Sequence, residues 1–115
     1  MNSKNINLSN TEIIKRIEVA KQMQKLGQFK EAEKVYADAL KNNGNSFDLI
    51  YSYALFCKDL KNYIFTKKLL VDLSKKFPSN IKSYIVLSEI LTIEKRFYEA
   101  EQVLLLAMNI EPKNS

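Results

Sequence analysis

A fixed spacing of 34 residues runs through this chain of 115 residues. The residues that keep this step are aromatic or small at matched positions: Phe29, Tyr63 and Phe97; Ala20, Ala54 and Ser88; Ala32, Thr66 and Ala100. Self-similarity at a constant period is the mark of a repeat architecture. The period defines three units, over residues 13–46, 47–80 and 81–114, without insertion or deletion between them.

Each unit has the apolar spacing of two helices. In the first half of the middle unit, Ile50, Tyr53, Ala54 and Cys57 fall at i, i+3, i+4 and i+7, which is one face of an α-helix. The second half of the last unit repeats this face with Phe97, Ala100, Leu104, Ala107 and Met108, and we expect Leu104 to pack in the core. The predicted helices cover residues 10–25, 29–43, 46–59, 63–76, 80–94 and 97–109.

Caps and turns agree with these bounds. Ser9 and Glu12 form a capping box before the first helix, and residues 1–12 are expected to be a flexible lead that ends in this cap, with 1–8 loose. Later caps fall to Asn45 or Ser46, to Asn62, and to Ser79 or Asn80. Gly27 lies where a left-handed residue joins two helices. Lys61 and Lys95 occupy the same turn, and in that conformation each costs about 1–2 kcal/mol.

Composition excludes most enzyme chemistry. The chain has 0 His, 1 Cys and only 2 Gly and 2 Pro, so His-based catalysis, a cysteine zinc site and a Gly-rich phosphate loop are all absent. We therefore expect no catalytic residues, no metal and no cofactor. No apolar run approaches the roughly 18 residues of a membrane span. The lone Cys57, on a core-facing position, favours a reduced, cytoplasmic setting.

The repeated unit resembles the tetratricopeptide repeat. The best match is Leu-Gly-Gln-Phe-Lys-Glu-Ala over 26–32, followed by Tyr36, Ala39 and Leu40, and Phe-Tyr-Glu-Ala over 97–100 repeats it. The resemblance implies an all-α fold: a right-handed helical solenoid of three helix–turn–helix repeats with six antiparallel helices, in a single domain over 13–114.

The resemblance also implies a function. The first helix of each unit would line a concave groove that binds a peptide or helix of a protein partner, without catalysis. The residues implied for this peptide-binding groove are Ile17, Lys21, Gln24, Tyr51, Leu55, Lys58, Lys82, Ile85 and Glu89. Ile17, Tyr51, Leu55 and Ile85 would form its apolar strip. Two alternatives stay open: a self-assembling repeat scaffold, and the repeat segment of a longer protein such as a transferase.

Part of this family grips the C-terminal carboxylate of chaperone tails. It uses Lys and Asn in the first unit, Asn in the second, and Lys and Arg in the third. The matching positions here are Ile17 and Lys21, Ser52, Lys82 and Val86. Only Lys82 keeps its type, and one lysine cannot replace several converging donors. We therefore do not expect binding of the chaperone tail.

The net charge of +5 does not by itself indicate nucleic-acid binding. A nucleic-acid reader typically has a one-sided basic stripe with arginines and interleaved aromatics. This chain has 2 Arg, and its clearest basic run, Lys67–Lys68 with Lys75–Lys76, lies on the second helix of the middle unit. Solvated lysines on a convex face are the favoured interpretation.

The end of the third unit is unusually apolar. Four consecutive apolar residues, 103–106, are followed by Met108 and Ile110, and such a run surrounds a helix instead of forming one stripe. We expect this end to be covered by another copy of the chain or by further sequence. The residues predicted for self-association are Leu105, Leu106 and Ile110.

Overall fold

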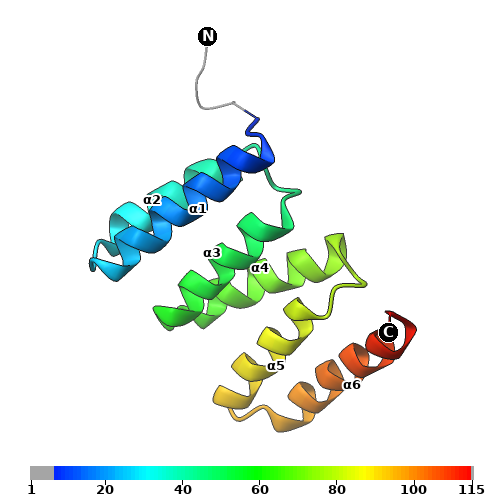
Figure 1. Ribbon diagram of the computed structural model, residues 1–115. Helices are drawn as coiled ribbons and strands as arrows, with labels where there is room; N and C mark the ends of the chain where they lie inside the picture. The colour runs from blue at the N-terminus through cyan, green and yellow to red at the C-terminus, as the bar shows by residue number, and fades with distance from the viewer. Residues whose placement is uncertain (1–6, 115) are drawn as a thin grey trace. The chain divides into compact units, whose positions relative to one another are not determined.

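The computed structural model describes the backbone of residues 7–114 and the side chains of residues 7–110. Over this range the chain forms helices and turns and no strand, as Figure 1 shows. The helices are α1 (Asn10–Lys25), α2 (Phe29–Leu40), α3 (Phe47–Asp59), α4 (Tyr63–Lys76), α5 (Lys82–Ile93) and α6 (Phe97–Asn114). The predicted all-α class with six helices is confirmed. Of the lead predicted to be loose, residues 1–6 lie outside the described residues.

Three helix bounds differ from the prediction by two residues or more. Helix α2 ends at Leu40 instead of 43, because the Asn43 side chain donates to the carbonyl of Ala39 (2.7 Å) and terminates the helix. Helix α5 begins at Lys82 instead of 80, since the Asn80 side chain accepts from the Lys82 amide (3.0 Å). Helix α6 continues past Pro112 to Asn114, beyond the predicted end at residue 109.

The chain divides into two compact units, which differ from the three 34-residue repeats. From here on, the first unit is the part up to Tyr53 and the second unit is the part from Ala54 onward; the boundary between them falls within α3. The single repeat domain expected over 13–114 stays a prediction. In the first unit, α1 and α2 pack side by side. In the second, α5 packs against both α4 and α6 (Figure 1).

The three turns within the helix pairs share one backbone conformation. Gly27, Lys61 and Lys95 have φ of 78°, 63° and 63°. In each turn, the next N–H donates to the carbonyl five residues earlier: Gln28 to Met23 (2.8 Å), Asn62 to Cys57 (2.9 Å) and Arg96 to Leu91 (2.8 Å). These are Schellman motifs, which satisfy the last carbonyls of a helix. The predicted left-handed turns are confirmed, including both strained lysines.

Helix N-termini are capped largely as predicted. Ser9 Oγ accepts from the Glu12 amide (3.2 Å), and the Glu12 carboxylate accepts from the Ser9 amide (2.9 Å), which completes the capping box. The bond from the Ser9 backbone is the main reason that the pKa of Glu12 is lowered. Ser46 caps α3 through the Leu49 amide (3.2 Å), and Asn62 caps α4 through the Phe65 amide (3.4 Å).

The core of the first unit is built on repeat positions. Ile13, Ile17 and Ala20 of α1 are buried, as are Ala32, Tyr36 and Ala39 of α2. The rings of Tyr36 and Tyr53 stack with their centroids 5.2 Å apart. The small residues at the 34-residue step let paired helices approach closely, which is why they recur.

The core of the second unit follows the same positions. Thr66, Leu69, Leu70 and Leu73 of α4 are buried, and the Thr66 hydroxyl donates to the Asn62 carbonyl (2.8 Å). The free thiol of Cys57 is also buried, so its predicted core position is confirmed; the cytoplasmic setting stays a prediction. The expectation that Leu104 belongs to the core is wrong, because its side chain is exposed.

Candidate functional site

The predicted groove residues of the second unit come from α3 and α5. Leu55 and Lys58 of α3 are half-buried, and Ile85 and Glu89 of α5 are exposed. Lys58 Nζ lies 3.1 Å from Glu89 Oε1, so the two helices present these positions side by side. Leu55 and Ile85 lie about one helical turn before Lys58 and Glu89. We call these four residues the α3–α5 surface.

Chemically, the α3–α5 surface pairs apolar contact area with one ion pair. The Lys58 and Glu89 side chains remain 30% and 51% exposed, so water screens their attraction and they contribute little to stability. The same exposure leaves both groups able to bond a polar backbone or side chain that comes to lie on the surface. Apolar anchors beside polar groups are the usual composition of a peptide-binding surface.

The predicted groove residues of the first unit are Lys21, Gln24 and Tyr51. Lys21 is exposed on α1 and Gln24 is half-buried one turn later. Tyr51 of α3 is half-buried, and its ring stacks on Phe47 with centroids 5.5 Å apart and planes 19° apart. The stacking holds an aromatic side chain at a fixed place, which lowers the entropy cost of using it as a contact.

One predicted groove residue is corrected by the structure. Ile17 is only 5% exposed, because it lies on the α1 face that it shares with Ile13 and Ala20 and that packs into the core. Val86, one of the positions compared with the carboxylate clamp, is buried as well. Lys82 is exposed at the first position of α5. Ile17 is therefore removed from the predicted apolar strip, and the assignment of Tyr51, Leu55 and Ile85 to it stays a prediction.

The described residues offer no site for metal chemistry. No group of three or more His, Cys, Asp or Glu side chains in that part of the chain could hold a metal ion. Within the same limits, no helix is both long and apolar enough to cross a membrane.

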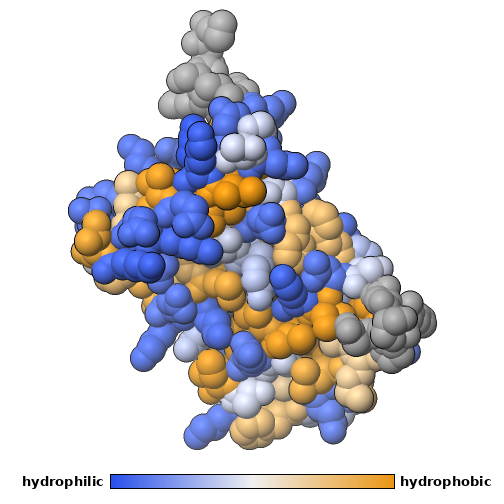
Figure 2. All heavy atoms as spheres, in the orientation of Figure 1, coloured by the Kyte–Doolittle hydropathy of each residue, from blue (hydrophilic) through white to orange (hydrophobic). Residues whose placement is uncertain are grey.

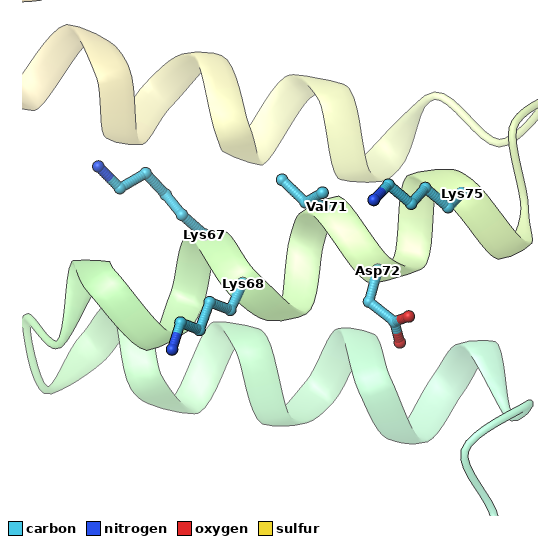
Figure 3. A pocket seen from close by; sticks show the side chains of 5 residues that line it. All are labelled: Lys67, Lys68, Val71, Asp72 and Lys75. Atoms are coloured by element: carbon cyan, nitrogen blue, oxygen red, sulfur yellow. The ribbon is translucent and has the colours of Figure 1, made fainter.

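Helix α4 carries an open hollow of about 370 Å³ lined by Lys67, Lys68, Val71, Asp72 and Lys75 (Figure 3). Two of its charges are already used. Lys67 Nζ bonds Glu94 at 2.8 Å and 3.1 Å, and Asp72 pairs with Lys76 at 3.1 Å. The hollow lies on a second helix, so it is separate from the α3–α5 surface. Lys68 and Lys75 are exposed, as expected from the sequence, whereas Lys67 is half-buried in its bond to Glu94.

The residues predicted for self-association lie on α6. Leu105 and Leu106 are 50% and 54% exposed, and Ile110 is half-buried. Two further residues of this surface are Leu104, which was expected in the core, and Met108, which belongs to the same apolar stretch of the sequence; they are 42% and 64% exposed. Figure 2 shows apolar side chains gathered where Figure 1 places α5 and α6. The signal for the exposure of Leu104 was its place in the uninterrupted apolar run over 103–106.

Comparisons with known proteins identify the fold. No protein-family model and no curated protein match the sequence. Among solved structures, the translocator chaperone SycD of the Yersinia enterocolitica type III secretion system is similar to this chain, with a TM-score of 0.79 at 15% identity. The match covers 89% of this chain and 76% of SycD.

A second similar structure is the first TPR of Spaghetti (RPAP3), bound to the HSP90 peptide SRMEEVD. Its TM-score is 0.76 at 17% identity, over 93% of this chain and 85% of that one. The chain has the tetratricopeptide-repeat fold. The predicted resemblance is thus confirmed at the level of structure. Identities this low establish the fold and leave function to be argued from the site.

Proposed function

We propose that this tetratricopeptide-repeat chain is a non-catalytic module that binds a peptide or helix of a protein partner on the first helices of its repeats. The observation that carries the proposal is the α3–α5 surface. Two aliphatic side chains, Leu55 and Ile85, remain accessible there beside the Lys58–Glu89 pair. Accessible aliphatic side chains on rigid, neighbouring helices suit the side chains of an extended or helical peptide.

Similar structures support a peptide as the ligand. SycD has been solved in complex with a peptide of the translocator YopD, and that structure matches 89% of this chain with a TM-score of 0.77. Both TPRs of RPAP3 were solved with an HSP90 peptide. The same fold therefore holds peptides in proteins that share about one residue in six with this chain.

The chemistry of this chain favours a peptide held by its side chains instead of its C-terminus. Of the positions that hold a terminal carboxylate elsewhere in the family, two carry the buried residues Ile17 and Val86. Of these positions only Lys82 keeps the residue type that grips a terminal carboxylate. We expect the ligand to supply apolar side chains to Leu55 and Ile85, with a polar group beside Lys58 and Glu89.

The test begins with selection of short peptides from a random displayed library on the full chain. Selected peptides are then synthesised, and their affinity is measured by fluorescence anisotropy. We expect Leu55→Ala and Ile85→Ala each to weaken binding by about fivefold or more, the effect of losing an anchor worth over about 1 kcal/mol. Ile64→Ala on α4 is the matched control, since Ile64 is an exposed aliphatic residue away from this surface.

Amidating the peptide C-terminus should leave the affinity unchanged. Thermal melts of the variants should stay close to that of the parent chain, because Leu55 is half-buried and Ile85 exposed. The proposal fails if no peptide is enriched, or if the selected peptides bind Leu55→Ala and Ile85→Ala as tightly as Ile64→Ala.

We propose self-association through α6 as a second function, which would make the chain a scaffold. The observation that favours it is the exposure of Leu105 and Leu106 together on one helix. Burying one leucine stabilises an assembly by about 1.5–3 kcal/mol, so several on one helix provide a driving force for association. Concentration-dependent mass in sedimentation tests this function independently of peptide binding.

A further inference from the structure

We infer that the α6 helices of two copies of this chain pack against each other about a two-fold axis, so that assembly stops at a dimer. The inference deepens the self-association proposed above and rests on it. We call Leu104, Leu105, Leu106, Met108 and Ile110 the α6 surface. Three observations indicate what covers it: the exposure of the matching residues on α4, the absence of charged side chains on this part of α6, and the polar residues exposed on α1.

Helix α4 shows what a following repeat covers. Leu70 of α4 is fully buried, and α5 of the next repeat contacts α4. Val71 nevertheless stays 40% exposed, and the neighbouring Asp72 side chain stays 47% exposed. The same two positions of α6 are Leu105 and Leu106, 34 residues later. A further repeat after α6 would therefore cover Leu104 and leave Leu105 and Leu106 in water.

The charge pattern of α6 suits a contact with itself. From Gln102 to Ile110 no side chain is charged, whereas the matching stretch of α4 contains Lys68, Asp72, Lys75 and Lys76. Two copies of α6 can therefore approach without burying a charge or opposing like charges, either of which would weaken the contact. A helix that is apolar on all sides is one that is covered on all sides.

Helix α1 rules out head-to-tail growth. Helix α3 is the first helix of the middle repeat, and its residues Leu49, Ile50 and Phe56 are buried. The matching positions of α1 are Lys15, Arg16 and Gln22, all exposed. Docking α6 of one copy onto α1 of the next would bury these polar groups against leucines. The α6 surface is thus left with another α6, which gives a closed contact in which both copies use the same residues.

The experiment uses the full chain and two measurements. Sedimentation velocity over a wide concentration range should show a mass rising from 13.3 kDa to twice that value and no further. Leu105→Glu should raise the dimer dissociation constant by about tenfold or more, while Ile64→Glu, at an exposed position on α4, should leave it unchanged. Circular dichroism confirms that both variants fold.

The second measurement tests the symmetry. A residue near a two-fold axis meets its own copy, so Leu105→Cys or Met108→Cys should oxidise to a covalent dimer, and Ile64→Cys should not. The native Cys57 is buried and does not compete. A series of growing oligomers would overturn the two-fold contact while leaving self-association intact. A monomer at all concentrations would overturn both. A dimer insensitive to Leu105→Glu and without either crosslink would place the contact elsewhere.

Discussion

Helices α4 and α6 are the same element of consecutive repeats, yet their surfaces differ. Both follow a turn in which a lysine has φ of 63°, and both have a small buried residue one turn into the helix. Leu70 of α4 is nevertheless fully buried, while Leu104, 34 residues later, is 42% exposed. At matched positions 34 residues apart, Asp72 and Lys76 of α4 are replaced by Leu106 and Ile110 of α6, and Ser74 is replaced by Met108.

The difference shows that the repeat determines the backbone conformation and the position of a residue on its helix, but not which elements surround that residue. A given repeat position is buried only where a neighbouring element covers it. Helix α6 is contacted by α5, and no element in the described part of the chain covers its Leu104 side. A leucine at the same repeat position is therefore buried in the middle repeat, as Leu70, and exposed in the last repeat, as Leu104.

The largest expected effect comes from truncating the same slot in the two helices. Leu70→Ala should lower the free energy of unfolding by about 2–5 kcal/mol, because it leaves a cavity in a buried position. Leu104→Ala should lower it by less than about 1.5 kcal/mol, since much of that side chain is already in water. Urea denaturation of both variants, at the lowest workable protein concentration, measures the two changes.

Low concentration matters in this test because a dimer through α6 would bury Leu104 and enlarge its effect. Val71→Ala, an exposed residue of α4, is the control and should change stability by no more than about 0.5 kcal/mol. Equal losses for Leu70→Ala and Leu104→Ala in the monomer would contradict the difference between the two helices.

The sequence was sufficient to predict the backbone. Helix spacing, the capping box at Ser9 and the left-handed turns at Gly27, Lys61 and Lys95 all depend on residues within a few positions of each other. Local physical chemistry determines such features, so the period together with the residue types at each helix end located them. The differences at the end of α2 and at the start of α5 depended on which Asn side chain bonded the backbone, and several polar residues were available there.

The candidate site was harder to predict, because exposure depends on packing between helices. Ile17 was assigned to the groove by its slot, but it shares the α1 face of Ile13 and Ala20, which is buried. The error for Leu104 was the opposite: it was expected to be buried but is exposed, because no neighbouring element in the described part of the chain covers it. Both errors concern what covers a side chain, which a pattern within one repeat does not contain.

A smaller effect is expected in α5, the helix that contacts both α4 and α6. Ser83 is buried in the slot that holds Leu49 in α3, and its hydroxyl is the one buried side-chain oxygen or nitrogen without a hydrogen-bond partner among the described residues. Ser83→Ala removes that group and should raise stability by about 1 kcal/mol. Thermal denaturation measures the gain.

Ser88→Ala is the matched control on the same helix. The Ser88 hydroxyl donates to the Ile85 carbonyl at 2.7 Å, so its loss should be neutral or destabilising. A fall in stability for Ser83→Ala would mean that its hydroxyl has a partner in solution.

The turns before α4 and α6 should respond alike, in contrast to the helices themselves. Lys61→Gly and Lys95→Gly should each stabilise the chain by about 0.5–1 kcal/mol, because relief of left-handed strain exceeds the added chain entropy of glycine. Gly27→Ala should cost about 1 kcal/mol. The space around Gly27 is open, so the cost comes from its φ of 78° alone. Guanidinium denaturation measures the stability of the three variants. If one lysine substitution stabilises the chain and the other destabilises it, the two turns are not equivalent.

The smallest effect separates the first turns of α4 and α6 by pH. Helix α4 has no acidic residue in its first turn, and its cap is the neutral Asn62. Before α6, Arg96 donates to the Glu99 carboxylate, and this bond is the main reason that the pKa of Glu99 is lowered. A carboxyl with a lowered pKa in the folded state stabilises that state above its unfolded pKa. The contribution is lost as the pH falls through the folded pKa.

Acidification from about pH 6 to about pH 3 should therefore loosen the first turn of α6 more than that of α4. Amide hydrogen exchange at the two turns, with the Glu99 carboxyl followed by NMR, measures the difference. Glu99→Gln should abolish the pH dependence at α6, because the amide keeps the shape of the side chain without its charge. If the two turns loosen equally, or if Glu99 titrates at its ordinary pKa, the Arg96–Glu99 bond does not persist in solution. The two helix starts would then be equivalent, and the contrast between α4 and α6 would lie entirely in their outward side chains.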